Sequence, residues 1–249
     1  MSVLLILDGL VGVGKTTLSK ALEGTCADLG LSVQIYAEAE VPTVTYDDHA
    51  VSAQDSNLRQ LTRMPHPQHV WIDADQDTFE RIGQELMELR LERAKRFVQA
   101  MHQVEAKLLI FDGGLFHRDL DCLWLMNIPL EWLYQHTLAY VKCLQSIEPV
   151  LVYLSQSDVE QGLRRIHALR GSMWHQGETR WLVDSPYGRQ HEYRRFSGYL
   201  QLYQVLHQYH RELYEKLNMV KVSLETSQAR WSEYAQELLS RLEMAPQAD

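Results

Sequence analysis

The chain contains few cysteines, and none of them forms a closely spaced pair. Its three cysteines, Cys26, Cys122 and Cys143, are scattered over 249 residues without a Cys-x-x-Cys motif. An odd, scattered set argues against a disulfide framework and indicates a reducing compartment, so we expect a cytoplasmic protein. Each cysteine is most simply explained as a small buried apolar residue.

Long apolar runs and a surplus of basic charge are absent as well. No apolar segment approaches the ~20 residues of a membrane-spanning helix. The first apolar run, residues 3–7, lacks the basic segment and the length of a signal peptide. The formal net charge is −9, with 33 acidic residues against 24 Lys and Arg, which argues against binding of a nucleic-acid polymer. We therefore expect neither a membrane nor a nucleic acid as a partner.

Apolar segments alternate with amphipathic ones along the chain. We expect strands at residues 3–7, 31–37, 107–114, 149–155 and 219–225. We expect helices at residues 15–29, 76–105, 130–147, 158–169 and 190–217, and a last helix that ends near residue 242. Because continuous apolar strands are typical of parallel sheets, the sequence predicts one α/β domain over residues 1–249, with a five-stranded parallel sheet.

Two segments interrupt this alternation. Residues 41–77 hold three prolines and several histidines and aspartates but little periodicity, so we expect an irregular insertion with a short helix near 56–63. The histidines of this insertion match no zinc-ligand spacing. Residues 171–189 are polar, and we expect a loop there. Long irregular segments of compact domains often form lids or binding loops, so both segments are candidates for the walls of a ligand site.

The segment DGLVGVGKTT, residues 8–17, carries the strongest chemical signal. It matches G-x-x-x-x-G-K-[ST], with Gly9, Gly14, Lys15 and Thr16 at the fixed positions. Ordinary residue frequencies give roughly 0.01 chance matches in a chain of this length. The motif also lies between an expected buried strand and an expected helix, which is the context of a phosphate-binding loop.

Each part of this motif has a physical reason to bind phosphate. Glycines let successive backbone N–H groups curl around one concavity, and the following helix adds its unpaired N–H groups and the positive end of its dipole. The lysine brings a positive charge to the outer phosphates, and the threonine hydroxyl is a ligand for Mg²⁺. The sequence therefore predicts ATP and Mg²⁺ as cofactors. The predicted nucleotide-binding residues are Gly9, Gly12, Val13, Gly14, Lys15, Thr16 and Thr17.

Other classes of phosphate-loop protein fit the chain less well. GTPases carry Asp-x-x-Gly after their metal-binding strand, whereas Leu115 stands here in place of that glycine. They also read guanine with Asn-Lys-x-Asp, which the segment 153–158 lacks. Hydrolytic ATPases place an acidic residue directly after the metal-linked aspartate, whereas Gly113 follows Asp112. These differences favour a small-molecule kinase, whose catalysis rests on positioning and charge.

Three further features carry a family resemblance. Glu38 and Glu40 follow the second expected strand in YAEAEVP, Asp112 ends the third expected strand in IFDGG, and arginines flank the polar segment 171–189. Together with the phosphate loop, these features resemble the deoxynucleoside kinase and thymidylate kinase superfamily. The resemblance implies a three-layer P-loop NTPase fold with strand order 2-3-1-4-5 and a lid over the phosphates at residues 164–195.

The resemblance also implies roles for these residues. Glu38 or Glu40 would take the proton of the attacking hydroxyl or orient the acceptor, and the order Glu-Val-Pro in place of Glu-Pro leaves open which of them corresponds. Asp112 would hold Mg²⁺ through water or bind the acceptor; as an alternative, it would cap the glycine turn that follows it. The arginine that the family places after this aspartate is Gly113 here, and Arg118 is the nearest substitute.

The arginines of the lid are the expected phosphate clamp. Phosphoryl transfer needs positive charge around the transferred group, and arginine presents a planar fork that stays charged. A solvated helix end, with arginines that complement the helix dipole, is the alternative. The catalytic candidates are Arg164, Arg165 and Arg170, and a second cluster comprises Arg189, Arg194 and Arg195.

The whole pattern predicts an ATP- and Mg²⁺-dependent kinase for a small molecule, with a nucleoside or nucleoside monophosphate as the expected acceptor. A non-nucleotide alcohol as acceptor, and a nucleotide-binding regulatory protein without transfer activity, are the alternatives. The aromatic residues Trp71, Phe79, Phe116 and Trp124 would pack in the core or stack on a ring of the acceptor. The tyrosines between 199 and 214 recur at helical spacing, which core packing or the interface of a homodimer would explain.

Overall fold

The fold is that of a computed structural model. The described residues are 3–37, 71, 73–101 and 103–243. Most of the predicted insertion at 41–77, with its expected helix near 56–63, lies outside the described residues. Glu38 and Glu40 lie outside them as well, so their predicted roles remain predictions.

The described residues contain one five-stranded sheet in which all strands are parallel. The strands are β1 (Val3–Asp8), β2 (Val33–Tyr36), β3 (Leu108–Asp112), β4 (Pro149–Ser155) and β5 (Val220–Glu225). Their order is β2-β3-β1-β4-β5, which confirms the predicted order. The central strand β1 places Leu5 beside Ile110 of β3 and Val150 of β4. The carboxyl ends of β1, β3 and β4 therefore lie next to one another, at the edge where parallel sheets bind ligands.

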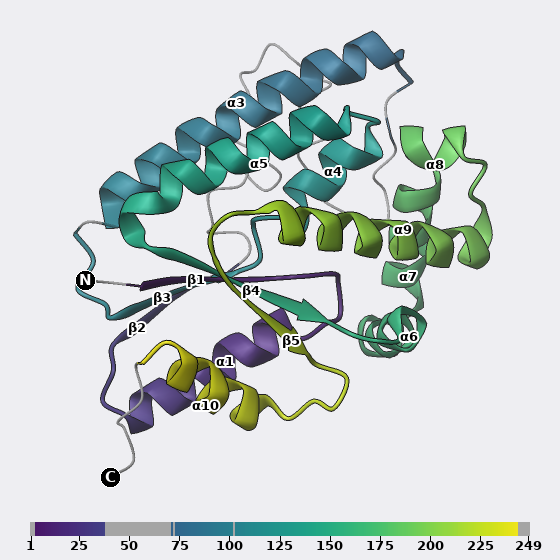
Figure 1. Cartoon of the computed structure of the whole chain (residues 1–249). Helices are drawn as coiled ribbons and strands as arrows, with labels where there is room; N and C mark the ends of the chain where they lie inside the picture. Colours follow the sequence, from purple (N-terminus) through teal and green to yellow (C-terminus); the bar gives the residue numbers. More distant parts are fainter. Residues whose placement is uncertain (1–2, 38–70, 72, 102, 244–249) are drawn as a thin grey trace.

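Helices cover both faces of this sheet (Figure 1). They are α1 (Lys15–Asp28), α3 (Gln76–Met101), α4 (Asp119–Leu125), α5 (Leu130–Leu144), the 3₁₀ helix η1 (Gln145–Ile147), α6 (Val159–Arg170), α7 (Ser172–Val183), α8 (Pro186–Gln190), α9 (Arg195–Lys216) and α10 (Trp231–Arg241). In Figure 1, α1 and α10 lie below the sheet, whereas α3, α5 and α9 lie above it. The arrangement is thus an α/β fold with a layer of helices on each face.

The apolar composition of the central strands follows from this double cover. Residues 4–7 of β1 and 108–111 of β3 are fully buried, because each strand face meets a helix layer. The edge strands β2 and β5 are half-exposed and contain polar residues such as Gln34 and Lys221. The continuous apolar runs that predicted strands in the sequence are therefore the most buried segments of the sheet.

The prediction of a loop at residues 171–189 is wrong, because this segment forms the helices α7 and α8. Gly171, with a φ of 83°, separates α6 from α7. Ser185 is the N-cap of α8: its Oγ accepts a hydrogen bond from the Gly188 N–H at 2.9 Å, and Pro186 is the first helical residue. Leu182 is buried, so α7 has a short apolar face that its polar composition conceals.

Helix α4 is a second departure from the expected elements. All seven of its residues, from Asp119 to Leu125, are buried. A helix that is buried on all sides has no amphipathic period, which is why the sequence pattern does not reveal it. Helix α9 begins at Arg195 rather than near residue 190, after Arg194 in extended conformation.

The four candidate stacking aromatics are part of the core. Trp71, Phe79, Phe116 and Trp124 are all buried. Trp71 stacks on Trp181 of α7, with ring centroids 5.6 Å apart, and donates its indole N–H to the Trp181 carbonyl at 2.6 Å. The tyrosines of α9 at 199, 203 and 209 are also buried, so core packing explains their helical spacing.

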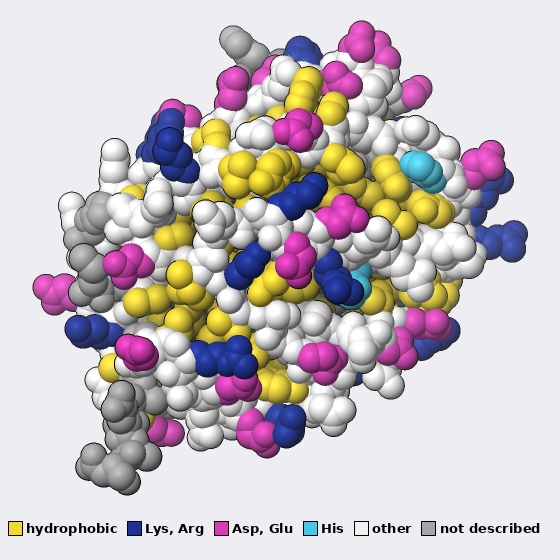
Figure 2. Space-filling view, in the orientation of Figure 1, with side chains coloured by type: hydrophobic (Ala, Val, Ile, Leu, Met, Phe, Trp, Pro, Cys, Tyr) yellow, Lys and Arg dark blue, Asp and Glu magenta, His cyan; other side chains and the backbone are white. Residues whose placement is uncertain are grey.

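The surface mixes charges of both signs. Figure 2 shows acidic and basic side chains interspersed between apolar ones over the face it displays. Among the helices of the described residues, none combines the length and the apolar character that a membrane crossing requires.

Leu151 tests the role of the central strands in stability. It lies in β4 with 0% of its surface exposed, whereas Leu169 at the end of α6 is 77% exposed. Leu151→Ala should lower the free energy of unfolding by about 2–5 kcal/mol, because it leaves a cavity in a close-packed core. The matched variant Leu169→Ala should change it by less than about 0.5 kcal/mol. Urea unfolding of the two variants measures both values, and equal values would contradict the fold.

Candidate active site

The loop between β1 and α1 requires glycine at two positions. Gly9 and Gly14 have φ of 140° and 99°, values that side-chain-bearing residues rarely adopt. A Cβ on Gly9 would lie 2.2 Å from the Leu154 carbonyl oxygen, and one on Gly14 would lie 2.0 Å from the Trp231 ring. These two glycines are therefore required both by conformation and by space.

The loop directs positive charge and unpaired N–H groups to one place. α1 begins at Lys15 directly after Gly14, and within the described residues no side chain caps its first turn. The first turn, Lys15 to Thr17, contains no acidic residue, and the Thr16 and Thr17 side chains are exposed. An uncapped helix start of this kind favours an anion through its N–H groups and its dipole.

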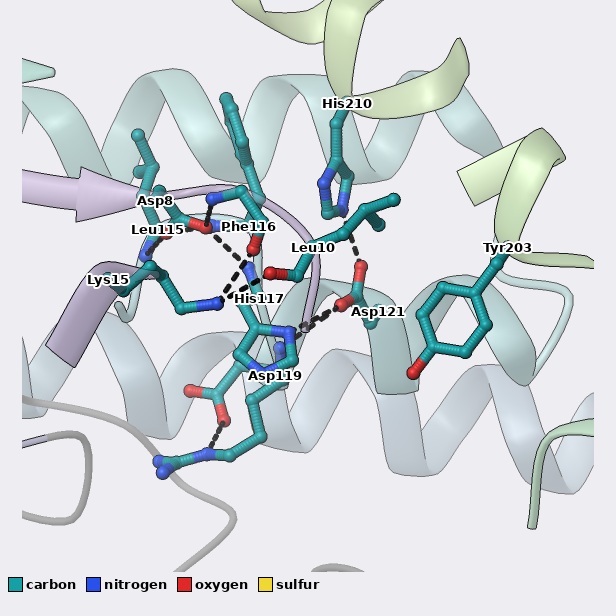
Figure 3. A network of polar contacts seen from close by, with 12 residues as sticks. Asp8, Leu10, Lys15, Leu115, Phe116, His117, Asp119, Asp121, Tyr203 and His210 are labelled. Atoms are coloured by element: carbon teal, nitrogen blue, oxygen red, sulfur yellow. Dashed lines mark hydrogen bonds and ion pairs between the residues drawn. The ribbon is translucent and has the colours of Figure 1, made fainter. Parts of the chain in front are cut away.

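Lys15 is held against the loop. Its Nζ donates hydrogen bonds to the carbonyl oxygens of Gly9 at 2.9 Å and Leu10 at 3.0 Å, and the residue is buried (Figure 3). The ammonium group therefore lies within the turn of the loop rather than in solvent. The predicted phosphate-contacting residues from Gly9 to Thr17 thus lie together at the carboxyl end of β1.

Asp8 links this loop to the segment after β3. Its Oδ1 accepts hydrogen bonds from the backbone N–H groups of Gly9 at 2.7 Å and His117 at 3.1 Å. Its Oδ2 accepts from Leu115 at 2.7 Å and Phe116 at 2.9 Å. Figure 3 shows Asp8 between these groups. One buried carboxylate therefore fixes two loops that come from neighbouring strands.

Asp112 lies beside this junction. It is buried at the end of β3, opposite Leu7 in the register of β1. Gly113 and Gly114 follow with positive φ of 93° and 101°, and the Gly113 N–H donates to the Leu7 carbonyl at 2.8 Å. The predicted metal ligands Thr16 and Asp112 thus come from two segments that meet at the same sheet edge.

The residues present fit Mg²⁺ only as an ion that is held mainly by phosphate and water. Among the described residues, no three His, Cys, Asp or Glu side chains form a group that would hold a metal ion. Mg²⁺ commonly binds one or two protein ligands together with substrate phosphates and several waters. A hydroxyl from Thr16 and a carboxylate from Asp112 would suit this mode.

Arg118 is buried beside α4. It precedes the first residue of α4 with a φ of 80°, and its Nε lies 3.9 Å from the Asp119 Oδ1. Asp119 also pairs with Arg90 of α3, whose Nε lies 3.4 Å from the other carboxylate oxygen. The predicted substitute for the missing arginine is therefore part of a buried charge cluster at the β3–α4 connection.

Arg90 is the centre of this cluster, and sequence reasoning did not identify it. Its guanidinium group is fully buried and donates to the carbonyl oxygens of Gly114 at 2.6 Å and Leu115 at 2.9 Å. It also contacts His136 Nε2 at 3.0 Å and lies over the Tyr140 ring at 3.9 Å. Arg90 lies one turn after Leu86 and one turn before Ala94, on the buried face of α3. A charged residue on an otherwise apolar helix face is the sequence feature that could have identified it.

Helix α6 brings the predicted lid to the loop. A Cβ on Gly12 would lie 3.2 Å from the Ile166 side chain and 3.3 Å from the Gly162 carbonyl oxygen, so α6 packs directly on the loop between β1 and α1. Arg165 precedes Ile166 and is half-buried. Of the three predicted catalytic arginines in the lid, Arg165 directly precedes Ile166, whose side chain contacts the loop.

The other two arginines of the predicted lid contact side chains of α6, α7 and α9, the last through Arg164 over the Phe196 ring at 5.2 Å. The Arg164 guanidinium pairs with Glu160 one turn earlier in α6. Arg170 lies over the Trp174 ring, 4.8 Å from its centroid. The second cluster is distributed over two elements: Arg189 belongs to α8, and Arg194 and Arg195 form the start of α9.

The loop between β1 and α1 is also bound to the segments that follow β4 and β5. Thr226, which follows β5, donates its hydroxyl to the Val13 carbonyl at 2.8 Å and lies 3.0 Å from the Ser155 carbonyl. The Gln156 side-chain amide donates to the Gly12 carbonyl at 3.4 Å. These contacts fix the carbonyl groups of Gly12 and Val13, and with them the second half of the loop.

A buried group of titratable residues lies at the other side of the Asp8 junction. Asp121 of α4 is placed between His117, at 3.2 Å, and His210 of α9, at 2.6 Å. Burial alone would raise the pKa of Asp121, but the charge of His210 and the hydrogen bonds from both histidines outweigh it and hold this pKa well below its ordinary value. Sequence reasoning did not identify this group, although His117 directly precedes Arg118.

Glu178 of α7 extends this group toward the lid. Its carboxylate accepts a hydrogen bond from the Tyr203 hydroxyl. Burial raises the pKa of Glu178, and the Tyr203 hydrogen bond and the nearby charge of His117 oppose that effect. Glu178 and His117 therefore lie close enough to interact electrostatically, although they come from α7 and from the connection after β3.

No protein-family model matches the sequence, and no curated protein matches it significantly. The chemistry of the site therefore has to be argued from its own residues.

Asp8→Asn tests the junction between the two loops. The variant places an NH₂ group where a carboxylate oxygen accepts N–H groups, so at least one pair of buried amides loses its acceptor. We expect the free energy of unfolding to fall by about 2–4 kcal/mol. Urea unfolding at pH 7 measures this loss, with Asp28→Asn at the exposed end of α1 as control. A loss below about 0.5 kcal/mol would show that Asp8 does not organise the loops.

The buried His136 should make the free energy of unfolding depend on pH. Burial and the Arg90 charge lower the pKa of His136 to about 3. Between the ordinary histidine pKa of about 6.5 and this value, acid protonates His136 in the unfolded chain only, so stability falls as the pH falls. His136→Gln keeps an acceptor for Arg90 and should remove up to about 1.4 kcal/mol of this loss per pH unit.

Urea unfolding between pH 7 and pH 4 measures the two slopes. The exposed residue His191 provides a matched control, because His191→Gln removes an imidazole outside the core. Identical slopes for wild type and His136→Gln would overturn the assignment of this acid sensitivity to His136.

Proposed function

We propose that the protein is an ATP- and Mg²⁺-dependent phosphotransferase that acts on a small molecule, with a nucleoside or nucleoside monophosphate as the acceptor class. One observation carries the proposal: G-x-x-x-x-G-K-T lies at the carboxyl end of the central strand β1, with the uncapped start of α1 and the Lys15 ammonium on the same loop. This combination of N–H groups, helix dipole and cation suits the phosphates of a nucleotide.

Each residue of the site has a role in this proposal. The N–H groups of the P-loop and Lys15 hold the phosphates of ATP, and Thr16 and Asp112 are the ligands that this chain offers to Mg²⁺. Mg²⁺ supplies charge neutralisation between the phosphates. Arg165, with Arg164 and Arg170 as further candidates, adds positive charge around the transferred group. Glu38 or Glu40 orients the acceptor.

The rigidity of the site supports transfer rather than simple binding. Phosphoryl transfer gains most of its rate from fixed positions and fixed charges. Asp8 joins the P-loop to the connection after β3, and Arg90 holds the carbonyls of Gly114 and Leu115 on that connection. The donor loop and the segment that would face the acceptor are therefore held relative to each other.

A non-nucleotide alcohol is the second candidate acceptor. Gly113 occupies the position at which the resembling kinases carry an arginine, and Arg118 is buried with its Nε 3.9 Å from Asp119. An acceptor with its own phosphate would need a cation that is not already neutralised. This arrangement favours an acceptor that presents a hydroxyl.

A thermal-shift screen identifies the acceptor class. The probes are a non-hydrolysable ATP analogue with Mg²⁺, alone and combined with nucleosides, nucleoside monophosphates and sugar-like alcohols. A ligand that binds only the folded state raises its stability, by about 2.7 kcal/mol at 100 times its Kd. The acceptor should add a second increment on top of that of the nucleotide.

Lys15→Ala tests the catalytic proposal. Removal of one fixed cation from the phosphates should lower ATP-dependent transfer at least about 100-fold. The exposed lysine of the same helix, Lys20, provides the control, and Lys20→Ala should retain wild-type transfer. Transfer of the γ-phosphoryl group from labelled ATP to the acceptor panel is measured at equal folded concentrations. Unchanged transfer by Lys15→Ala would sink the proposal.

A further inference from the structure

The imidazole of His117 is oriented by a carboxylate. Its Nδ1 lies 3.2 Å from the Asp121 Oδ2, and the same oxygen accepts the Arg118 N–H at 3.3 Å. The other oxygen of Asp121 is 2.6 Å from the Nε2 of the fully buried His210. Figure 3 shows His117 and His210 on opposite sides of this carboxylate. Asp121 is therefore fixed by its own partners and in turn fixes the His117 ring.

The partners of Asp121 decide which nitrogen of His117 carries the proton. An ionised carboxylate can only accept hydrogen bonds, and every neighbour at its oxygens is a donor or a histidine nitrogen. The Nδ1 of His117 must then carry a proton in order to bind Asp121. In the neutral ring the lone pair is left on Nε2, which is the form that a general base requires.

The backbone places this imidazole at the donor loop. The backbone N–H groups of His117 and Gly9 bind the same oxygen of Asp8. The backbone of His117 therefore lies beside the first residue of the P-loop. The side chain is 17% exposed, unlike the almost fully buried Asp121 and His210 that support it. Four elements contribute the charged and titratable groups around His117. Asp8 of β1 binds its backbone N–H, Asp121 of α4 binds its ring, His210 of α9 binds the other oxygen of Asp121, and Glu178 of α7 is near enough for the charges to interact.

We propose that His117 is the general base that activates the acceptor hydroxyl, with Asp121 as its positioning residue. The inference rests on the proposed function and deepens it, because it commits the acceptor to an alcohol. Nε2 of His117 takes the proton of the hydroxyl while the oxygen bonds to the γ-phosphorus of ATP. The bond from that phosphorus to the β-bridging oxygen breaks, and ADP leaves with the electron pair. The Asp121 carboxylate stabilises the imidazolium, whose proton then passes to water.

Asp121 orients His117 as the third residue of a catalytic triad orients the general base. It holds the ring in one tautomer and compensates the positive charge that forms on proton transfer. Glu38 and Glu40 are the competing bases, and they keep the role of orienting the acceptor. The two assignments differ in pH dependence, because an ordinary carboxyl titrates near 4 and an ordinary imidazole near 6.5.

His117→Asn is the decisive variant, because the asparagine amide can replace the Nδ1 donor toward Asp121 but has no base at the Nε2 position. We expect kcat/KM for an alcohol acceptor to fall by about 10²–10⁴-fold, which is the usual contribution of a general base. The KM for ATP should stay within about twofold. The control His191→Gln should behave as wild type, since His191 is exposed on the far end of α8.

The experiment measures kcat/KM from pH 5 to 9 with nucleosides and sugar-like alcohols as acceptors and labelled ATP as donor. Wild type should lose activity on the acid side with a slope of one, and His117→Asn should lose this limb. Asp121→Asn should lower kcat/KM and change the His117 tautomer in ¹⁵N NMR spectra. Circular dichroism and the thermal shift with the ATP analogue show whether each variant is folded.

Three results would overturn the inference. If His117→Asn keeps both its activity and the acid limb, His117 has only a structural role. An acid limb that persists in His117→Asn and disappears in Glu38→Gln or Glu40→Gln assigns the base to a carboxylate. Transfer to monophosphates but to no alcohol excludes the committed acceptor class. In each case transfer that still depends on Lys15 leaves the proposed function intact, whereas wild type that transfers to no acceptor ends both proposals.

Discussion

The site depends on one interaction, the binding of four backbone N–H groups by the Asp8 carboxylate. These groups belong to Gly9 on one loop and to residues 115–117 on the other, which come from adjacent parallel strands. Hydrogen bonds to a charged acceptor contribute about 1.5–3 kcal/mol each, so this contact is strong enough to fix both loops. The same carboxylate therefore explains why the loop after β1, the end of β3 and His117 lie at one place.

Buried charges support this junction at a cost to stability. Arg90 and Asp119 have lost nearly all contact with water, and such pairs often stabilise a protein less than apolar residues of similar size. What they provide is position: the guanidinium group holds the carbonyls of Gly114 and Leu115, directly before the residues that Asp8 binds. A fixed charge network beside this loop would suit the proposed phosphotransferase, because phosphoryl transfer is catalysed mostly by positioning and electrostatics.

The sequence predicted those parts of the molecule whose physics is local. The apolar runs predicted the parallel sheet, and the family resemblance predicted its strand order. Gly9, Gly14 and Lys15 predicted a tight loop between β1 and α1. It could not predict contacts between distant segments, such as Asp121 with His210, 89 residues apart, or Trp71 with Trp181. A wholly buried helix such as α4 shows no period, and α7 shows too short an apolar face.

The most direct test of the account is a crystal structure with Mg²⁺, ADP and aluminium fluoride, which mimics the phosphoryl group in transfer. The account predicts phosphates bound by the N–H groups of residues 9–17 and the Lys15 ammonium moved from the Gly9 and Leu10 carbonyls to the nucleotide. It places the fluoride on the side of the loop that faces His117. A nucleotide bound elsewhere, or a saturated crystal in which Lys15 still contacts those carbonyls, would contradict it.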